Sequence, residues 1–162
     1  MAGQTPGSGA DSGIKKIFAT GLTETSATDM EGVGTIRHEG NKIYKWVKFD
    51  NGAGNVASVI GNFAYYLTAA LKNDTVTMDL SDSNFIGAGV FQSIIADLEF
   101  GWIQIMGKAT LTTALTAGAD GEALTPVGST DGTLDVSALA TDHIAAIADD
   151  ISVREVVLTC PF

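Results

Sequence analysis

Apolar positions along this chain come in short runs separated by clusters of Gly, Ser, Thr and Asp. The run Ile43–Phe49 is dense in strand-forming residues and is closed by Asp50-Asn51-Gly52, a strong turn signal. Both sides of this run mix large apolar side chains with Lys, whereas a strand packed on one side only would segregate them. We therefore predict a strand that meets a second sheet or another subunit on each face.

The clearest alternation of apolar and polar residues lies between positions 101 and 111. One side of this predicted strand carries only apolar side chains, and we expect it to face the core. Gly101 and Gly107 bracket the run, where a sheet would bend or another backbone would come close. The predicted core side consists of Ile103, Ile105, Ala109 and Leu111.

Several weaker patterns complete the expected set of elements. Residues 56–71 fit a helix or a strand, and a strand at the end of that stretch is favoured. Two Asp-Gly turn signals lie about eleven positions apart, a spacing typical of all-β domains. The remaining expected elements are an apolar segment over 87–95, a short strand over 75–80, the turns at Asp120-Gly121 and Asp131-Gly132, and a terminal strand pair over 144–148 and 153–160.

The N-terminal part differs from the rest of the chain. Residues 1–13 contain no apolar period, and a short apolar and basic island, Ile14–Phe18, is followed by another polar run through Gly34. Such islands often become ordered only on a neighbouring surface, for example by adding a strand to it, although an edge strand of the domain itself is the alternative. We predict a flexible arm over residues 1–34 and a β-rich domain over residues 35–162.

Composition supports this division. A length of 162 residues suits one domain, and 19 Gly with few helix-forming residues favour short strands over helices. No apolar stretch is long enough to span a membrane, and residues 1–13 lack the pattern of a secretory signal. We therefore expect a mainly β, single-domain protein with little helix, synthesised in the cytoplasm, with no membrane partner.

Charge is unevenly distributed. Residues 1–50 carry as many basic as acidic side chains, whereas residues 51–162 account for the whole net charge of −10. An acidic surface repels phosphate backbones, so we expect no direct contact with nucleic acid. The acidic surface serves solubility alone, or the Lys-containing N-terminal third faces a different partner, and the sequence favours neither reading.

Candidate catalytic groups are sparse. His143 follows Asp142, but neighbours in a strand point to opposite faces and could not readily cooperate. Cys160, the only cysteine, is expected to fill space at the end of the last strand. We predict no catalytic residue, no cofactor and therefore no enzyme.

Two pairs of acidic residues could in principle bind a hard cation. They are Asp79 with Asp82 and Asp97 with Glu99, and neither follows a known calcium-loop spacing. Solvated loop carboxylates are the preferred interpretation, so we predict no metal site.

Trp46 and Trp102 are candidate subunit-interface residues, because an exposed Trp often anchors an interface. Ordinary core packing is the preferred alternative.

The C-terminal half resembles a known family. The run 101–109 is followed by an Ala-Gly turn over 117–121 and by a short apolar segment, 144–148, before the last strand. This order looks like the β-domain of tailed-phage capsid decoration, or cement, proteins, over roughly residues 85–162. The resemblance implies a compact β-barrel or β-tulip-like domain with an extended N-terminal arm.

The resemblance also implies a function and partners. Such proteins form small homo-oligomers, often trimers, on the outside of an expanded capsid, and they use an N-terminal arm to grip it. The expected partners are thus the major capsid protein and further copies of this chain, and the expected location is the capsid exterior. The gripping residues would be Ile14, Lys15, Lys16, Ile17 and Phe18. A tail or fibre component and a stand-alone β binding module are the alternatives.

Overall fold

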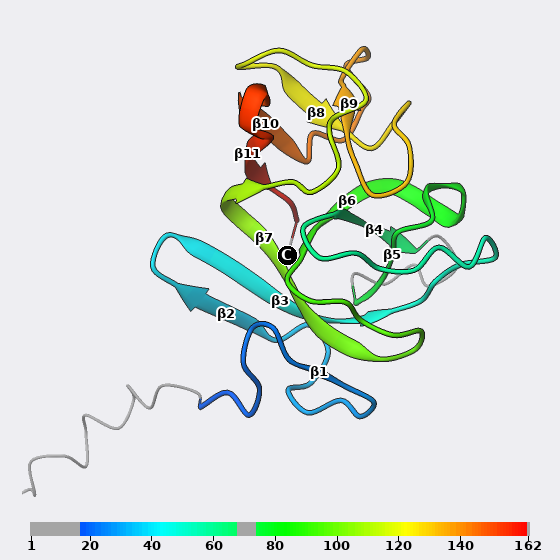
Figure 1. The fold of residues 1–162 in the computed structure, drawn as a ribbon, viewed down its shortest axis with the longest axis vertical. Coiled ribbons are helices and arrows are strands. Elements are labelled where there is room, and N and C mark those ends of the chain that lie inside the picture. Colours follow the sequence, from blue (N-terminus) through cyan, green and yellow to red (C-terminus); the bar gives the residue numbers. More distant parts are fainter. Residues whose placement is uncertain (1–16, 68–73, 162) are drawn as a thin grey trace, which may run out of the picture.

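The computed structural model describes residues 17–67 and 74–161 and shows a mainly β chain, as the short apolar runs predict (Figure 1). Helix within these ranges is confined to the 3-10 turns η3 (Leu80–Asp82) and η4 (Ile151–Val153). No helix in the described part is long and apolar enough to cross a membrane. The strands are β1 (Thr25–Ser26), β2 (Ile36–Glu39), β3 (Lys42–Phe49), β4 (Phe63–Leu67), β5 (Thr75–Thr77), β6 (Ser83–Phe91), β7 (Phe100–Thr110), β8 (Ala123–Thr125), β9 (Asp135–Val136), β10 (Ala146–Asp150) and β11 (Glu155–Thr159).

All strands of the described ranges belong to one mixed sheet. Its order is β2-β3-β5-β4-β6-β7-β11-β10-β8-β9, and β1 pairs with β7 beside this path. The β3–β5 pairing is parallel and the other pairings are antiparallel. Strand β3 also pairs with β7, so the pairings run from β3 through β5, β4, β6 and β7 back to β3. The long strands β3 and β7 therefore lie at the centre of the molecule (Figure 1).

The predicted core side of β7 is confirmed. Its side chains, with Leu111 just beyond the strand, join the main core cluster and are at most 6% exposed. The expected burial of β3 on both faces is also confirmed, because Val47 and Phe49 enter the main core while Tyr44 and Trp46 form a second cluster. Both faces meet other parts of the same chain.

The glycines that bracket the predicted strand have the expected kind of role. Gly107 has φ +91°, and a Cβ there would lie 2.7 Å from the backbone oxygen of Asn41, so another backbone comes close at this point. A Cβ on Gly101 would instead lie 2.6 Å from the side chain of buried Ile95. Gly107 thus leaves room for a neighbouring backbone, and Gly101 leaves room for a neighbouring side chain.

The boundaries of the other elements differ from the predicted ranges by a few residues. The ambiguous stretch 56–71 contains β4, the favoured strand, and the expected strand over 75–80 ends at Thr77 before η3 begins. The terminal pair is β10 and β11, joined through η4 as expected around Asp149-Asp150. Strand order and the β3–β7 contact had no counterpart in the sequence pattern.

Candidate functional site

Two tryptophans form an edge-to-face pair at the centre of the sheet. Trp46 of β3 lies directly opposite Trp102 of β7, with ring centroids 5.3 Å apart at 63°. Cross-strand aromatic pairs with this tilted geometry gain stability beyond their buried area. Both side chains are 0% exposed, so something else in the chain must cover them.

The cover is the segment of residues 17–34, which we call the N-terminal clasp. Phe18 meets the Trp102 ring edge-on at 5.5 Å, and Leu22 and Val33 pack against the same cluster. Within the clasp, β1 adds a short strand to β7, with Thr25 opposite Gly101. The clasp therefore belongs to the folded body.

Polar contacts of the clasp satisfy both indole N–H groups. The Nε1 of Trp102 donates to Thr20 Oγ1 at 2.9 Å, and the Nε1 of Trp46 donates to Asp29 Oδ1 at 2.8 Å. The Thr20 hydroxyl in turn donates to Glu31 at 2.8 Å. A buried indole N–H without a partner would cost stability, so these bonds favour the clasped arrangement specifically.

Arg37 of β2 secures the point at which the chain enters the fold. Its guanidinium lies 4.8 Å from the centroid of the Phe18 ring and donates to the carbonyl oxygen of Thr20 at 2.9 Å. It also pairs with Glu39. Ile17, the residue before Phe18, is 92% exposed. The packing contacts of the clasp thus begin at Phe18, and its first residue, Ile17, is turned to solvent.

These positions bear on two predictions from the sequence. The body does not begin at residue 35, because the polar run 19–34 contacts β3 and β7. These contacts are made by a few hydroxyl, carboxylate and apolar side chains whose spacing along the chain follows no period. Phe18 packs its ring against Trp102 in the aromatic cluster and is partly exposed, so its role as a gripping residue stays a prediction. Ile14, Lys15 and Lys16 lie outside the described residues.

The proposed interface role of the two tryptophans also changes. The preferred alternative, core packing, describes both, since neither presents any surface to a second chain. Any effect of the two tryptophans on contacts between copies would be indirect, through the clasp that packs on them.

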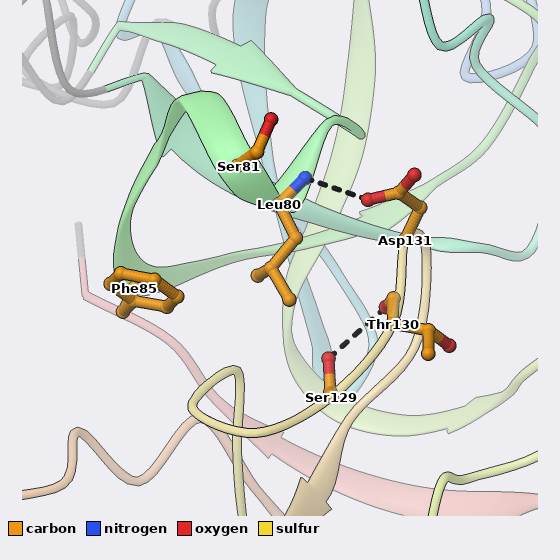
Figure 2. Close-up of a pocket in the computed structure, with 6 residues that line it drawn as sticks. All are labelled: Leu80, Ser81, Phe85, Ser129, Thr130 and Asp131. Atoms are coloured by element: carbon orange, nitrogen blue, oxygen red, sulfur yellow. Dashed lines mark hydrogen bonds between the residues drawn. The ribbon is translucent and has the colours of Figure 1, made fainter. Parts of the chain in front are cut away.

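A shallow pocket of about 410 Å³ lies between two loops on another part of the surface. We call it the loop pocket. Figure 2 shows the side chains of Leu80 and Phe85 on one wall and the 129–131 loop on the other. The backbone N–H of Leu80 donates to Asp131 at 2.9 Å and ties the two walls together. No pattern in the sequence pointed to this juxtaposition, because 51 positions separate the two residues.

Three of the four acidic residues considered as metal ligands, Asp79, Asp82 and Asp97, accept hydrogen bonds from loop residues. Asp79 accepts from Ser81 Oγ at 2.6 Å and from the backbone N–H of Gly54 at 2.8 Å. These hydrogen bonds, and the one from Ser81 most of all, keep the pKa of Asp79 below its usual value. Asp97 accepts from the backbone N–H of Asn51. Residues 17–67 and 74–161 contain no group of three His, Cys, Asp or Glu side chains that could hold a metal ion.

His143 and Asp142 do not act together in this fold. The Asp142 carboxylate accepts from the backbone N–H groups of Ala138 and Leu139, so it orders its own loop. Burial lowers the pKa of His143, whose Nδ1 has no partner among the described residues. Cys160 is buried, as expected of a filler, and burial raises its pKa.

No protein family, curated protein or solved structure matches this chain. Its function therefore has to be argued from its own geometry.

Lys45 is a buried cation whose removal we expect to be tolerated. It is 3% exposed, its Nζ donates to Tyr66 Oη at 3.1 Å, and burial lowers its pKa. We expect Lys45→Met to raise the free energy of unfolding at pH 7 by about 1 kcal/mol, because the apolar chain removes a buried charge. Denaturant unfolding with circular dichroism would measure this.

The pH dependence gives a sharper check on Lys45. Between its lowered folded pKa and the usual 10.5, the unfolded chain binds the proton that the folded chain has released, so stability rises with pH. The advantage of Lys45→Met should therefore shrink as pH rises from 7 towards 10. Burial raises the pKa of Tyr65 to about 12, so tyrosine ionisation lowers stability only above pH 10. A constant difference between the two proteins over pH 7–10 would contradict the assignment.

Proposed function

We propose that this chain is a structural module that binds the outer surface of a phage capsid at the junctions between capsomers and stabilises the expanded head. The observation that carries the proposal is the N-terminal clasp. It attaches the part of the chain before Ile17 to the two central strands through buried aromatic and hydrogen-bond contacts.

An arm that holds a second protein must be fixed firmly at its base. Here a pull on residues 1–16 would first meet Phe18 against Trp102 and the Arg37 bond to Thr20. Behind these contacts lies β7, which pairs with several neighbours across the sheet. Tension on the arm would therefore be spread over the whole body.

The residues that reach the shell would be Ile14, Lys15, Lys16 and Ile17. Ile17 supports this assignment, since a large apolar side chain that is 92% exposed buries nothing within its own chain. Phe18, the last residue of the predicted set, would anchor this segment, since its ring packs against Trp102. The apolar and basic character of the island suits a surface that has apolar grooves and carboxylates.

Stabilisation would arise from multivalency. A module bound across a junction adds contact area that must be broken before the capsomers separate. Several arms on one homo-oligomer, of which a trimer is the expected form, act at high effective concentration, so modest contacts for each arm suffice. The acidic body, with its net charge of −10 in residues 51–162, would face the solvent.

The test is removal of residues 1–16 with the clasp left in place. We expect this variant to keep its near-ultraviolet circular dichroism, because the tryptophan cluster begins at Phe18, and to lose co-sedimentation with expanded shells of the cognate capsid protein. Removal of residues 1–9 is the matched control and should leave binding intact. Unchanged co-sedimentation after removal of residues 1–16 would refute the proposal.

A further inference from the structure

The loop pocket carries an unusual aromatic residue on its rim. Phe85 is 46% exposed and has φ +57°, a left-handed conformation that bulky residues seldom adopt. Its backbone N–H donates to Ser83 Oγ at 3.2 Å, and that hydroxyl donates to Leu80 O at 2.8 Å. The chain thus holds an exposed ring at this position against its local preference, which is typical of a binding site.

The walls of the pocket are fixed before anything binds. Tyr65, which is 0% exposed, accepts from the backbone N–H of Thr133 at 2.9 Å, and its hydroxyl lies 3.0 Å from the carbonyl oxygen of Thr130. Asp131 Oδ1 fixes the other wall through Leu80 (Figure 2). An occupant would not have to order these loops, so little of its binding free energy would be lost.

The pocket has the chemistry to hold an apolar side chain next to a cation. Leu80 and Phe85 supply apolar walls. The second carboxylate oxygen of Asp131 points away from Leu80 in Figure 2 and has no hydrogen-bond partner among the described residues. Asp131 also lies in the acidic part of the chain, where few cations compete for it.

The geometry points to residues 14–17 of a second copy of this chain as the occupant. This Ile-Lys-Lys-Ile segment offers two branched apolar side chains and two adjacent cations, which match the walls and the free carboxylate oxygen. Because Phe18 is fixed against Trp102, the four residues 14–17 extend at most about 14 Å from it, so the second copy must place its loop pocket beside the clasp.

A second copy fits better than the arm's own body. In Figure 1 the chain enters the fold at the lower left, whereas the loops around η3 and residues 129–131 lie at the upper right. The four residues 14–17 are too few to cross the body to their own pocket, whereas the pocket of an adjacent copy can lie beside them. Head-to-tail contacts of this kind form rings where the rotation between copies closes. The inference rests on the proposed function only in that the same arm later exchanges this pocket for the shell.

The experiment uses the full chain without shells. Equal amounts of ¹⁴N- and ¹⁵N-labelled protein are unfolded together, refolded as a mixture and treated with a carbodiimide, which joins lysine amines to carboxylates that they contact. We expect mass spectrometry to find cross-links between Lys15 or Lys16 and Asp131 whose two halves carry different labels. Cross-links with matched labels only would mean that each arm occupies its own pocket, and would overturn the inference, as would their absence.

Phe85→Asn separates binding from folding. Asn tolerates the left-handed conformation better than Phe, so the variant should unfold at the same or higher denaturant concentration. The mixed-label cross-link should nevertheless fall about tenfold, because the apolar rim is lost. Ile94→Asn, at an apolar side chain 67% exposed elsewhere, is the matched control and should leave the yield unchanged. Equal yields from Phe85→Asn and the unmodified chain would overturn the assignment to this pocket.

Discussion

Replacing Trp102 by alanine is expected to lower the free energy of unfolding by about 3 to 5 kcal/mol. The indole is 0% exposed and contacts Trp46, Phe18 and the Thr20 hydroxyl, so its loss leaves a cavity between the sheet and the clasp. Urea unfolding followed by far-ultraviolet circular dichroism would measure the change. Few single substitutions elsewhere in the chain would remove as many contacts.

Two further variants make the Trp102 result specific. Trp102→Phe keeps an aromatic ring but loses the bond to Thr20, and should cost about 1 to 2 kcal/mol. Ile94→Ala, at a side chain 67% exposed, should change stability by less than about 0.5 kcal/mol. Trp102→Ala should also make the clasp a site of rapid proteolysis. A Trp102→Ala protein as stable as Ile94→Ala would show that the clasp does not cover the pair in solution.

Gly89→Ala is the second large expected effect, a loss of about 3 kcal/mol. Gly89 of β6 has φ +152°, and a Cβ there would fall on the backbone carbonyl oxygen of Gln104 in β7, far inside van der Waals contact. The two strands would have to separate where Val90 pairs with Gln104. The same unfolding measurement applies.

Gly121→Ala is the matched control for that effect. Gly121 also has a positive φ, +86°, but a Cβ there would meet nothing within 4 Å. This variant should lose only the roughly 1 kcal/mol that a left-handed conformation costs. Equal losses at positions 89 and 121 would mean that strain of the backbone alone, and not the close approach of β6 and β7, sets the requirement for glycine.

The clasp changes how the N-terminal third should be viewed. A flexible arm that ended at residue 34 would transmit force to the outer strand β2. Because the clasp covers the β3–β7 pair, force on the proposed arm would enter at the centre of the sheet, where both indole N–H groups and the Phe18 ring would resist it. This mechanical arrangement suits a protein that holds other proteins together.

Strands were the part of the fold best predicted from the sequence. Alternation identified the core side of β7, and mixed apolar faces indicated that β3 would be covered on both sides. Period and turn residues report the neighbours of a residue along the chain, which is sufficient to find a strand and its buried face. They carry no information on which strands become neighbours.

The candidate sites were predicted less well for the same reason. Thr20 and Asp29 look like ordinary loop residues in the sequence, and only the folded chain places them against the two indoles. Leu80 and Asp131 form the loop pocket from positions far apart in the chain. A polar segment that is fixed by a few specific hydrogen bonds has no hydrophobic period, so it was interpreted as flexible.

The sequence by itself determined that this is a mainly β chain with an acidic body, a core side on residues 103–111 and an apolar, basic island over residues 14–18. Those properties follow from local preference and composition, which are additive along the chain. Only the tertiary structure decided that the segment 17–34 belongs to the body, that Trp46 and Trp102 are internal, and that two distant loops enclose a pocket. Each of these depends on contacts between residues remote in sequence, whose free energy is gained only when the β3–β7 pairing and its neighbours have formed together.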